Sequence, residues 1–453
     1  MADRIADALI IVLDEGQSLA HRAALGDFQR DGALWDALRG PYERLVLITH
    51  GGPDDLAAGE RLGPEISVVC NAQRLATHMY VAAAAEEALG LLAGARSVVV
   101  RTEEMMAGAS AIEIVEGLRR AGLRVGFVGR GGYLWSRFIA VETGPGSQAA
   151  RAAAYRERAL CQAADVVIGA TETMVADLAW RYALPRSITA VVPNWVIEHD
   201  LVRTTDQRDK ATLMCVGALR PRKRIHLVVE AACLLKQSGV ADPIVRLIGD
   251  GPDRPALEAM ARRDGVELHF ESSIKYDALL QRMAECTVFL ATSSMESHPR
   301  TVLEAMSTAA PVIVADAPGL DAMVEHGVTG LRMAPEPQAF ARAIEGLLGD
   351  GGWRDALGSA AMRSVATQYS PRRVAELELA MHERAIELAG AAPETYIGAV
   401  SFEEELLGAD LDQARAAWRH SLLSFAGRFD RGDVFLRRLG AEIAHSSPQA
   451  DAA

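Results

Sequence analysis

The stretch Val288-Phe-Leu-Ala-Thr-Ser-Ser-Met-Glu-Ser-His-Pro-Arg-Thr-Val-Leu-Glu-Ala-Met306 decides the fold of this chain. Its apolar start predicts a buried strand at 288–292, and its polar middle predicts a short loop. Pro299 suits the first position of a helix. Glu296 is therefore expected on the loop at the carboxyl end of a strand, and Glu304 between one and two turns into the helix.

The carboxyl ends of strands in open α/β sheets are where ligands bind. The first amides of the following helix, near Thr301 and Val302, are expected to lack internal partners and to suit a phosphate. One carboxylate near a sugar and another near a ribose would then make a nucleotide-sugar site. The alternative for the spacing alone is a solvated loop glutamate and a helix-surface glutamate, so the rest of the chain must decide.

Short apolar runs alternate with helical patterns through most of the chain. The expected strands are 8–13, 45–49, 66–70, 98–101, 125–128, 166–169, 190–192, 213–217, 245–249, 268–270, 288–292 and 312–314. This alternation predicts parallel sheets that are covered by helices on both faces. The series is repeated on either side of a polar, strand-free stretch at 198–210. We therefore expect an α/β fold of two doubly wound, Rossmann-like domains that face each other across a cleft.

Composition limits the class of protein. The chain has 453 residues, a length that suggests two or three domains, and its formal net charge of −13 argues against nonspecific nucleic-acid binding. Five scattered cysteines indicate buried thiols in a reducing compartment and suggest no metal cluster. Neither a signal peptide nor a membrane span is evident, so the expected location is the cytoplasm.

The second half carries four features in a fixed order. A basic loop, Gly217-Ala-Leu-Arg-Pro-Arg-Lys-Arg224, follows a strand and opens a helix, where its cations would meet a diphosphate. The turn Gly249-Asp-Gly-Pro252 and the strand end Phe270-Glu-Ser-Ser-Ile274 come next, and the segment with Glu296 and Glu304 follows them. Each feature alone has an ordinary structural explanation, but their order and spacing are much more specific.

This half resembles the donor-binding domain of the GT-B glycosyltransferases, in particular the large family-4 group of retaining enzymes. The match runs over roughly 213–333, and the first half matches more loosely at 157–168 and 192–196. The resemblance and the linker together give the expected boundaries. These are an acceptor domain at 1–197, a linker at 198–210, a donor domain at 211–370, a crossover helix at 371–389 and a helical extension at 390–453.

The resemblance implies roles for individual residues. Lys223 would contact the donor diphosphate, Glu304 the ribose hydroxyls, and Glu296 with the backbone after it the sugar ring. Residues 272–274 would border the base. The remaining donor-site candidates are Gly217, Arg220, Arg222, Ser272, Ser273, Ile274, Ser297, His298, Arg300, Thr301 and Val302.

The chain also departs from the family pattern. Ala218 replaces the usual arginine of the basic loop, Arg224 stands where glycine is usual, and Ser-His-Pro follows Glu296 instead of a Gly-Phe-rich loop. Arg130 stands where these enzymes often carry a histidine, so it is a candidate for holding a phosphate or an acidic acceptor, although a plain flexible loop is the alternative there. Weaker cleft candidates on the acceptor side are Gly16, Gln17 and His50.

The resemblance implies retaining transfer of a sugar from a nucleotide-diphosphate sugar to a glycan, polysaccharide or lipid-linked acceptor. A fixed cation and helix amides can stabilise the leaving diphosphate without a metal, so no cofactor or divalent ion is expected. The only Asp-x-Asp triplet, Asp410-Leu-Asp412, falls in the tail. Alternatives are a catalytically degenerate nucleotide- or glycan-binding subunit, or an epimerase or phosphorylase of the same architecture.

The predicted extension contains a basic, aromatic stretch, Trp418-Arg-His-Ser-Leu-Leu-Ser-Phe-Ala-Gly-Arg-Phe429, in an otherwise acidic protein. A basic amphipathic helix of this kind could contact an anionic membrane at the inner face of the cell. The alternatives are packing on its own domain or on a second copy in a homodimer.

Overall fold

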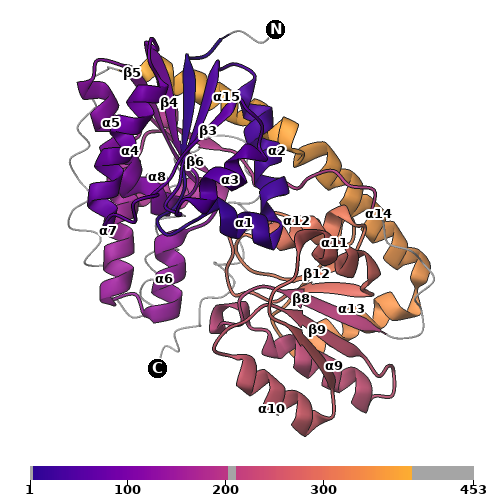
Figure 1. The fold of residues 1–453 in the computed structure, drawn as a ribbon. Helices are drawn as coiled ribbons and strands as arrows, with labels where there is room; N and C mark the ends of the chain where they lie inside the picture. Colours follow the sequence, from indigo (N-terminus) through magenta and orange to yellow (C-terminus); the bar gives the residue numbers. More distant parts are fainter. Residues whose placement is uncertain (1–3, 202–210, 390–453) are drawn as a thin grey trace, which may run out of the picture.

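The computed structural model describes residues 4–201 and 211–389 of the chain. Within them, strands alternate with helices to form two separate parallel sheets, each with helices around it (Figure 1). The predicted fold class is confirmed. The predicted extension at 390–453, with its Asp-x-Asp triplet and its basic aromatic stretch, lies outside the described residues.

The first sheet has seven strands in the order β3-β2-β1-β4-β5-β6-β7, and all of its pairs are parallel. Its strands are β1 (Ala8–Val12), β2 (Arg44–Ile48), β3 (Ile66–Val69), β4 (Ser97–Thr102), β5 (Arg124–Gly131), β6 (Val166–Gly169) and β7 (Thr189–Val191). The strand order reverses direction between β1 and β4. Such a switch point opens a crevice at the carboxyl ends of the two strands.

Helices connect these strands and cover the sheet. They are α1 (Leu19–Leu25), α2 (Asp27–Arg39), α3 (Asp54–Glu60), α4 (Thr77–Leu91), α5 (Gly108–Arg120), α6 (Trp135–Thr143), α7 (Gln148–Ala163) and α8 (Glu172–Tyr182). Two short 3-10 helices, η1 (Met105–Ala107) and η2 (Arg186–Ile188), complete this part.

Strand β1 shows why the sheet needs helices on both faces. Ile10 and Val12 belong to the apolar core on one face, and Leu9 and Ile11 belong to the core on the other. All four side chains are fully buried. Successive side chains of a strand point to opposite faces, so a continuous apolar run makes both faces hydrophobic.

The second sheet has six strands in the order β10-β9-β8-β11-β12-β13, again with only parallel pairs. Its strands are β8 (Thr212–Val216), β9 (Ile244–Ile248), β10 (Glu267–Glu271), β11 (Val288–Ala291), β12 (Val312–Ala315) and β13 (Leu331–Met333). The helices are η3 (Pro221–Lys223), α9 (His226–Gln237), α10 (Arg254–Asp264), α11 (Tyr276–Glu285), α12 (Arg300–Ser307), α13 (Pro337–Gly349) and α14 (Gly351–Gln368).

The last described helix, α15 (Pro371–Leu388), returns to the first sheet. Figure 1 shows it in orange, running from α14 back along the first domain beside α2 and β5. Gly126 on β5 permits this close packing, because a Cβ there would lie 2.8 Å from the backbone carbon of Ala385. Helix α15 therefore ties the two domains together.

The predicted elements match the observed ones with small shifts. The helix predicted from Pro299 begins one residue later, because Pro299 has an extended backbone (φ −66°, ψ 116°) and is the N-cap of α12. Strand β13 was not predicted, since it has only three residues and only Leu331 is buried among them. The two sheets fall on either side of the predicted linker, whose residues 202–210 are not described. All five cysteines are buried and free, as predicted.

Candidate functional site

Glu296 and Glu304 lie where the sequence predicts, one on the loop after β11 and one within α12. Both are buried, with 6% and 1% of their surfaces exposed. The solvated alternative for this pair is therefore wrong. Burying a carboxylate is costly unless it is paired, so the partners of each one define the site.

Glu296 is the centre of a cluster of cations from the basic loop. Its Oε1 pairs with Nζ of Lys223 and lies 3.1 Å from Nη1 of Arg222. The hydroxyl of Ser293 donates a hydrogen bond of 2.6 Å to the same oxygen. Burial alone would raise the pKa of Glu296, but the charges of Lys223 and Arg222 outweigh it and hold the pKa below its ordinary value. Glu296 is therefore ionised at neutral pH.

The basic loop is held in place by Arg224, the residue that stands where glycine is usual. Its backbone is left-handed (φ 45°), a conformation that costs a residue with a side chain roughly 1–2 kcal/mol. Its guanidinium donates to the carbonyls of Thr292 (3.0 Å) and Ser293 (2.7 Å), at the end of β11. These bonds compensate for the backbone strain and join the basic loop to the loop that carries Glu296.

The cations of this loop also contact the first domain, which the sequence did not indicate. Arg220 and Arg222 pair with Glu142 of α6, at 2.9 and 3.7 Å. The guanidinium of Arg222 also lies 3.9 Å from the ring centroid of Phe138, on the same helix. Glu142 thus pairs with two arginines that would otherwise be available to bind a diphosphate.

Glu304 pairs across the domain interface. Its Oε1 lies 3.5 Å from Nη1 of Arg30 on α2. Arg300, at the start of α12, reaches Asp31 of the same helix α2 at 3.3 Å. Burial would raise the pKa of Asp31, but the charges of Arg30, Arg300 and Arg22 lower it to about 2. In this arrangement a ribose could reach Glu304 only if Arg30 moved.

The amides at the start of α12 correct one sequence expectation. The Val302 amide is not free, because it donates to the carbonyl of Pro299 at 3.1 Å. The carbonyl of the N-cap residue Pro299 thus accepts a hydrogen bond from the amide three positions later and closes the first turn of α12. The amide of Thr301 has no such backbone hydrogen bond within the described part of the chain. Of the two amides, that of Thr301 is therefore the one that can still bind a ligand.

The loop after Glu296 forms two hydrogen bonds to the first domain. The Ser297 hydroxyl accepts from the amide of Leu134 at 2.8 Å, and the His298 carbonyl accepts from the side chain of Asn194 at 2.8 Å. Burial lowers the pKa of His298 to about 3, so its imidazole is neutral at physiological pH. The position of this loop therefore depends on how the two domains are arranged.

Arg130 lies at the end of β5 with none of its surface exposed. Its Nε lies 3.3 Å from Glu378 of α15, and its guanidinium stacks over Trp195 at 5.2 Å. The plain flexible loop considered as its alternative is not what the structure contains. Contact of Arg130 with an acceptor would require a rearrangement, so that role stays a prediction.

The other candidates are spread along the same cleft. Ser272, Ser273 and Ile274 follow β10, and the Ser272 hydroxyl accepts from Arg254 at 3.2 Å. Gly16, Gln17 and His50 come together at the ends of β1 and β2, where the His50 amide donates to the Gln17 carbonyl at 3.1 Å. Burial lowers the pKa of His50. Gly16, Gln17 and His50 thus lie on the first domain, apart from the cluster around Glu296.

Gly217 is explained by its backbone conformation. Its φ of +144° favours glycine, whereas a Cβ there would make only an ordinary van der Waals contact, 3.5 Å from Cε of Lys223. The glycine predicted for the phosphate-side loop therefore has a conformational role beside the lysine that pairs with Glu296.

Several residues at the interface carried no usable sequence signal. Arg30, Asp31 and Glu142 are charged residues within ordinary helical patterns, which usually face solvent. Asn194 and Trp195 lie in the stretch 192–196 that suggested the domain junction, so their region, though not their contacts, could be anticipated. Only the tertiary arrangement shows that these side chains meet the donor-side loops.

The side chains and helices of the described residues meet neither the requirements of a metal site nor those of a membrane-spanning helix. Among residues 4–201 and 211–389, no group of three or more His, Cys, Asp or Glu side chains could hold a metal ion. No helix in that part of the chain is both long and apolar enough to cross a membrane.

Comparison with protein families places the second half of the chain. Residues 198–364 match the family described as glycosyl transferases group 1. The lipopolysaccharide core biosynthesis glycosyltransferase LpsE of Rhizobium meliloti is 26% identical over 206 residues, which are 45% of this chain and 59% of the relative. The D-inositol 3-phosphate glycosyltransferase of Jonesia denitrificans is 31% identical over 182 residues, 38% of this chain and 42% of the relative. The chain thus spans about half the length of these curated relatives.

Solved structures extend the similarity of fold to both domains. Anabaena Alr3699/HepE in complex with UDP and glucose superposes with a TM-score of 0.62 at 18% identity, over 82% of this chain and 98% of that one. The lipopolysaccharide outer core galactosyltransferase WaaB, in its apo form, gives a TM-score of 0.58 at 14% identity, over 83% and 98%. At these identities the likeness shows a shared two-domain GT-B fold.

Proposed function

Because residues 198–364 match the group 1 glycosyltransferase family, we propose that this protein transfers a sugar from a nucleotide-diphosphate sugar to a glycan, polysaccharide or lipid-linked acceptor. The observation that carries the proposal is the cluster of Lys223 and Arg222 around the buried Glu296, at the carboxyl ends of β8 and β11. Two cations and the start of α12 meet there, where a leaving diphosphate needs positive charge. The HepE complex with UDP and glucose is consistent with such a donor.

In the proposed reaction, Lys223 and Arg222 bind the diphosphate and stabilise the charge that develops as the bond to the sugar breaks. Glu296 holds these cations in position before the donor arrives, and its loop faces the sugar ring. Glu304 binds the ribose hydroxyls after Arg30 withdraws from it. We propose retention of anomeric configuration, with attack on the face that the diphosphate leaves and with that phosphate accepting the acceptor proton.

We also propose that the reaction needs no divalent ion. The support is the charge already present, because Lys223, Arg220 and Arg222 supply three cations around the expected diphosphate position. Donor turnover is therefore expected to be the same in EDTA and in excess manganese. Activity that EDTA abolishes and manganese restores would contradict this part of the proposal.

The main test is donor binding by two variants. In Lys223→Ala the diphosphate loses a charge-assisted hydrogen bond worth roughly 1.5–3 kcal/mol, so nucleoside-diphosphate affinity is expected to fall roughly 10- to 100-fold. Glu304→Gln is expected to weaken binding of the nucleoside diphosphate and leave binding of inorganic diphosphate unchanged. Calorimetry with UDP, GDP, ADP and dTDP measures both, and hydrolysis of the corresponding sugar nucleotides measures turnover.

A matched control is Lys236→Ala on α9, whose lysine is 41% exposed and contacts Asp242 at 2.9 Å and the carbonyl of Gly265 at 2.7 Å. It should bind nucleotides like the wild type. Equal affinities in all three variants, or no binding of any nucleotide by the wild type, would favour a degenerate binding subunit.

A further inference from the structure

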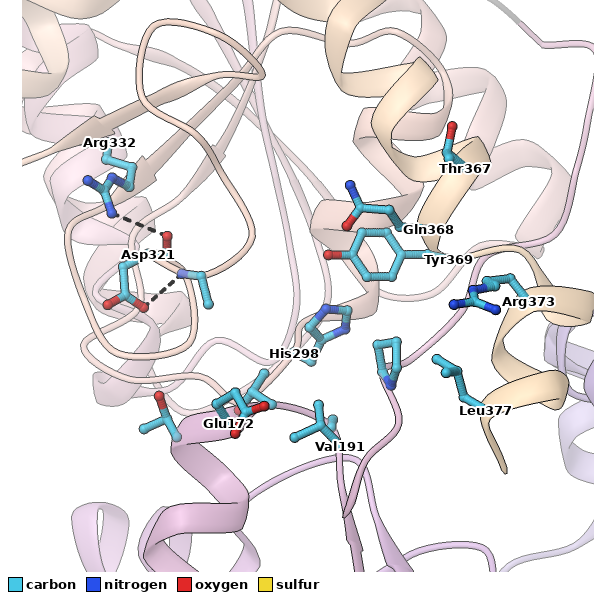
Figure 2. Close-up of a pocket in the computed structure, with 15 residues that line it drawn as sticks. Glu172, Val191, His298, Asp321, Arg332, Thr367, Gln368, Tyr369, Arg373 and Leu377 are labelled. Atoms are coloured by element: carbon cyan, nitrogen blue, oxygen red, sulfur yellow. Dashed lines mark hydrogen bonds between the residues drawn. The ribbon is translucent and has the colours of Figure 1, made fainter. Parts of the chain in front are cut away.

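A cavity of about 800 Å³ lies between the two domains, on the side of the crossover helix. We call it the crossover pocket and define it by Thr173, Pro193, His298, Asp321, Arg332 and Tyr369, which all line it. Figure 2 shows side chains from both domains and from α15 around this space. Its size is within the range of sites that hold a small ligand.

The crossover pocket begins next to the proposed sugar site. His298 lines it and is two residues from Glu296, so their Cα atoms are at most about 7 Å apart. Glu296 lines a different, small cavity together with Lys223, which does not include His298. The loop 296–299 thus lies between the donor cations and the crossover pocket, so a ligand in the pocket would contact the loop that we propose faces the sugar ring.

Three side chains that line this pocket each have a polar atom without a hydrogen-bond partner among the described residues. Asp321 uses Oδ1 to accept from the amides of Gly319 (3.0 Å) and Ala322 (2.9 Å), whereas its Oδ2 accepts nothing from the described residues. Arg332 donates from Nη1 to the carbonyl of Asp321 at 3.2 Å, and its buried Nε has no partner. The buried Nδ1 of His298 also has none.

An aromatic surface completes the lining. The ring of Tyr369 lies beside that of His298, with 5.1 Å between centroids, and Figure 2 shows its hydroxyl directed into the space toward Arg332. Pro193 and Leu377 add apolar surface to the lining. A combination of aromatic and apolar walls with a few fixed polar groups suits a ligand that has both C–H faces and hydroxyls.

The charges of the lining balance. His298 is neutral at physiological pH, and the charges of Asp321 and Arg332 oppose each other. Glu172 and Arg373 add one further charge of each sign. A neutral ligand is therefore favoured, and its hydroxyl groups can donate to Asp321 and accept from Arg332.

We propose that the crossover pocket binds a neutral sugar residue of the acceptor. This rests on the proposed glycosyltransferase function and extends it by assigning an acceptor subsite to the crossover side of the cleft. A second cavity of about 550 Å³ shares Asp321, Ala322 and Arg332 with the pocket. The two spaces adjoin at these residues, which leaves room for a further sugar and favours an oligosaccharide acceptor over a single small molecule.

The test measures binding of neutral methyl hexosides and of a neutral disaccharide to the full chain by saturation-transfer NMR. Binding of inorganic phosphate, the anionic comparison, is measured by the broadening of its phosphorus-31 signal. Asp321→Asn keeps an acceptor for the two loop amides and changes only the charge and the free oxygen. Tyr369→Phe removes only the hydroxyl. Each is expected to weaken sugar binding at least fivefold and to change nucleoside-diphosphate affinity less than twofold. The matched control, Glu345→Gln on α13, should bind sugars like the wild type.

The outcomes separate the pocket from the proposed function, because donor hydrolysis by water is measured on the same variants and needs no acceptor. If the wild type hydrolyses a donor but no neutral sugar binds, or if the Asp321 and Tyr369 variants bind sugars like the control, the acceptor subsite is wrong and the transferase function stands. Binding of phosphate in preference to sugars would also overturn the subsite. If no sugar nucleotide binds or reacts, the function itself fails.

Discussion

Single buried charges determine the geometry of the cleft. Arg101 and Arg130 share the carboxylate of Glu378, and all three side chains are fully buried. Burial would raise the pKa of Glu378, but the charge of Arg101 and hydrogen bonding hold it far below its usual value. A buried charge without its partner is strongly destabilising. This explains why Arg130 is directed into the protein and away from the solvent.

Asp14 is the opposite case. It lies just beyond β1 with 7% of its surface exposed, and its Oδ1 has no hydrogen-bond partner among residues 4–201 and 211–389. Burial and the nearby carboxylates of Glu104 and Glu103 raise its pKa to about 8. The folded protein therefore keeps this proton at neutral pH, whereas the unfolded chain releases it near pH 4.

The sign of the effect on stability follows from the bound protons. Between about pH 4 and pH 8 the folded state binds the Asp14 proton and the unfolded state does not, so Asp14 lowers stability as the pH rises. Asp14→Asn removes this penalty. The variant should be more stable than the wild type at pH 7, by on the order of 2–4 kcal/mol, given 1.36 kcal/mol per pKa unit.

Urea unfolding at pH 5, 6, 7 and 8 measures this difference. The advantage of Asp14→Asn should grow by about 1.4 kcal/mol per pH unit until it levels off near pH 8. A difference that is independent of pH would contradict a raised pKa. The variant Asp36→Asn, at an exposed position on α2, serves as the control.

At the scale of elements, the turns after β8 and β9 are pressed against each other. A Cβ on Gly249 would lie 2.0 Å from the carbonyl oxygen of Gly217, and one on Gly251 would lie 2.4 Å from that of Leu219. The amide of Gly217 donates to the carbonyl of Ile248 at 2.9 Å. The Gly-Asp-Gly turn thus supports the basic loop directly, which gives its glycines a role beyond a simple βα connection.

We therefore expect Gly249→Ala to destabilise the protein by roughly 2–4 kcal/mol, from the strained backbone at φ +139° and from overpacking. The basic loop must shift to relieve the contact, so nucleoside-diphosphate affinity should fall as well. Gly265→Ala is the matched control, since its φ is +65° but a Cβ there meets nothing within 4 Å. It should cost about 1 kcal/mol and leave binding unchanged. Equal losses would show that packing against Gly217 is unimportant.

For the whole molecule, the two domains are held together by polar contacts and by α15. Leu134 and Asn194 of the first domain bond to the loop after Glu296, and Glu142 pairs with the basic loop. These contacts involve the same residues that the proposed donor and acceptor would use. Substrate binding and domain arrangement should consequently be coupled.

This coupling predicts the behaviour of Glu142→Gln. Its two ion pairs, with Arg220 and Arg222, together contribute about 1 kcal/mol by the usual range for such pairs. Because a diphosphate competes for the same cations, removing the charge should tighten nucleoside-diphosphate binding about fivefold. Calorimetry at low and high salt measures this effect, and the gain in nucleoside-diphosphate affinity over the wild type should become smaller as the salt concentration increases. Glu113→Gln, at an exposed site on α5, is the control. Weaker binding by Glu142→Gln would mean that the pairs organise the site.

Much of the fold could be predicted from local pattern. Buried parallel strands are short apolar runs, and each predicted run has a counterpart in one of the two sheets. Strand β13 was not predicted because only one of its residues is buried. The prediction of a free Val302 amide was wrong because Pro299 is an N-cap whose carbonyl accepts from that amide. The positions of Glu296, Glu304 and Lys223 followed from order and spacing. The pairing of Arg30 with Glu304, and of Glu142 with the arginines of the basic loop, could not be predicted. A charged helix residue looks the same in sequence whether it faces solvent or another domain.

The sequence by itself determined the two α/β domains, the loop of Glu296 and the basic loop that faces it, because strand, turn and helix signals are local. Tertiary structure alone decided that Lys223 and Arg222 neutralise Glu296, that Arg30 covers Glu304, and that the crossover pocket opens beside His298. These contacts join residues far apart in the chain; Arg30 and Glu304, for example, are separated by 274 positions. Buried charges must find partners wherever the folded chain places them, and a linear pattern does not record that placement.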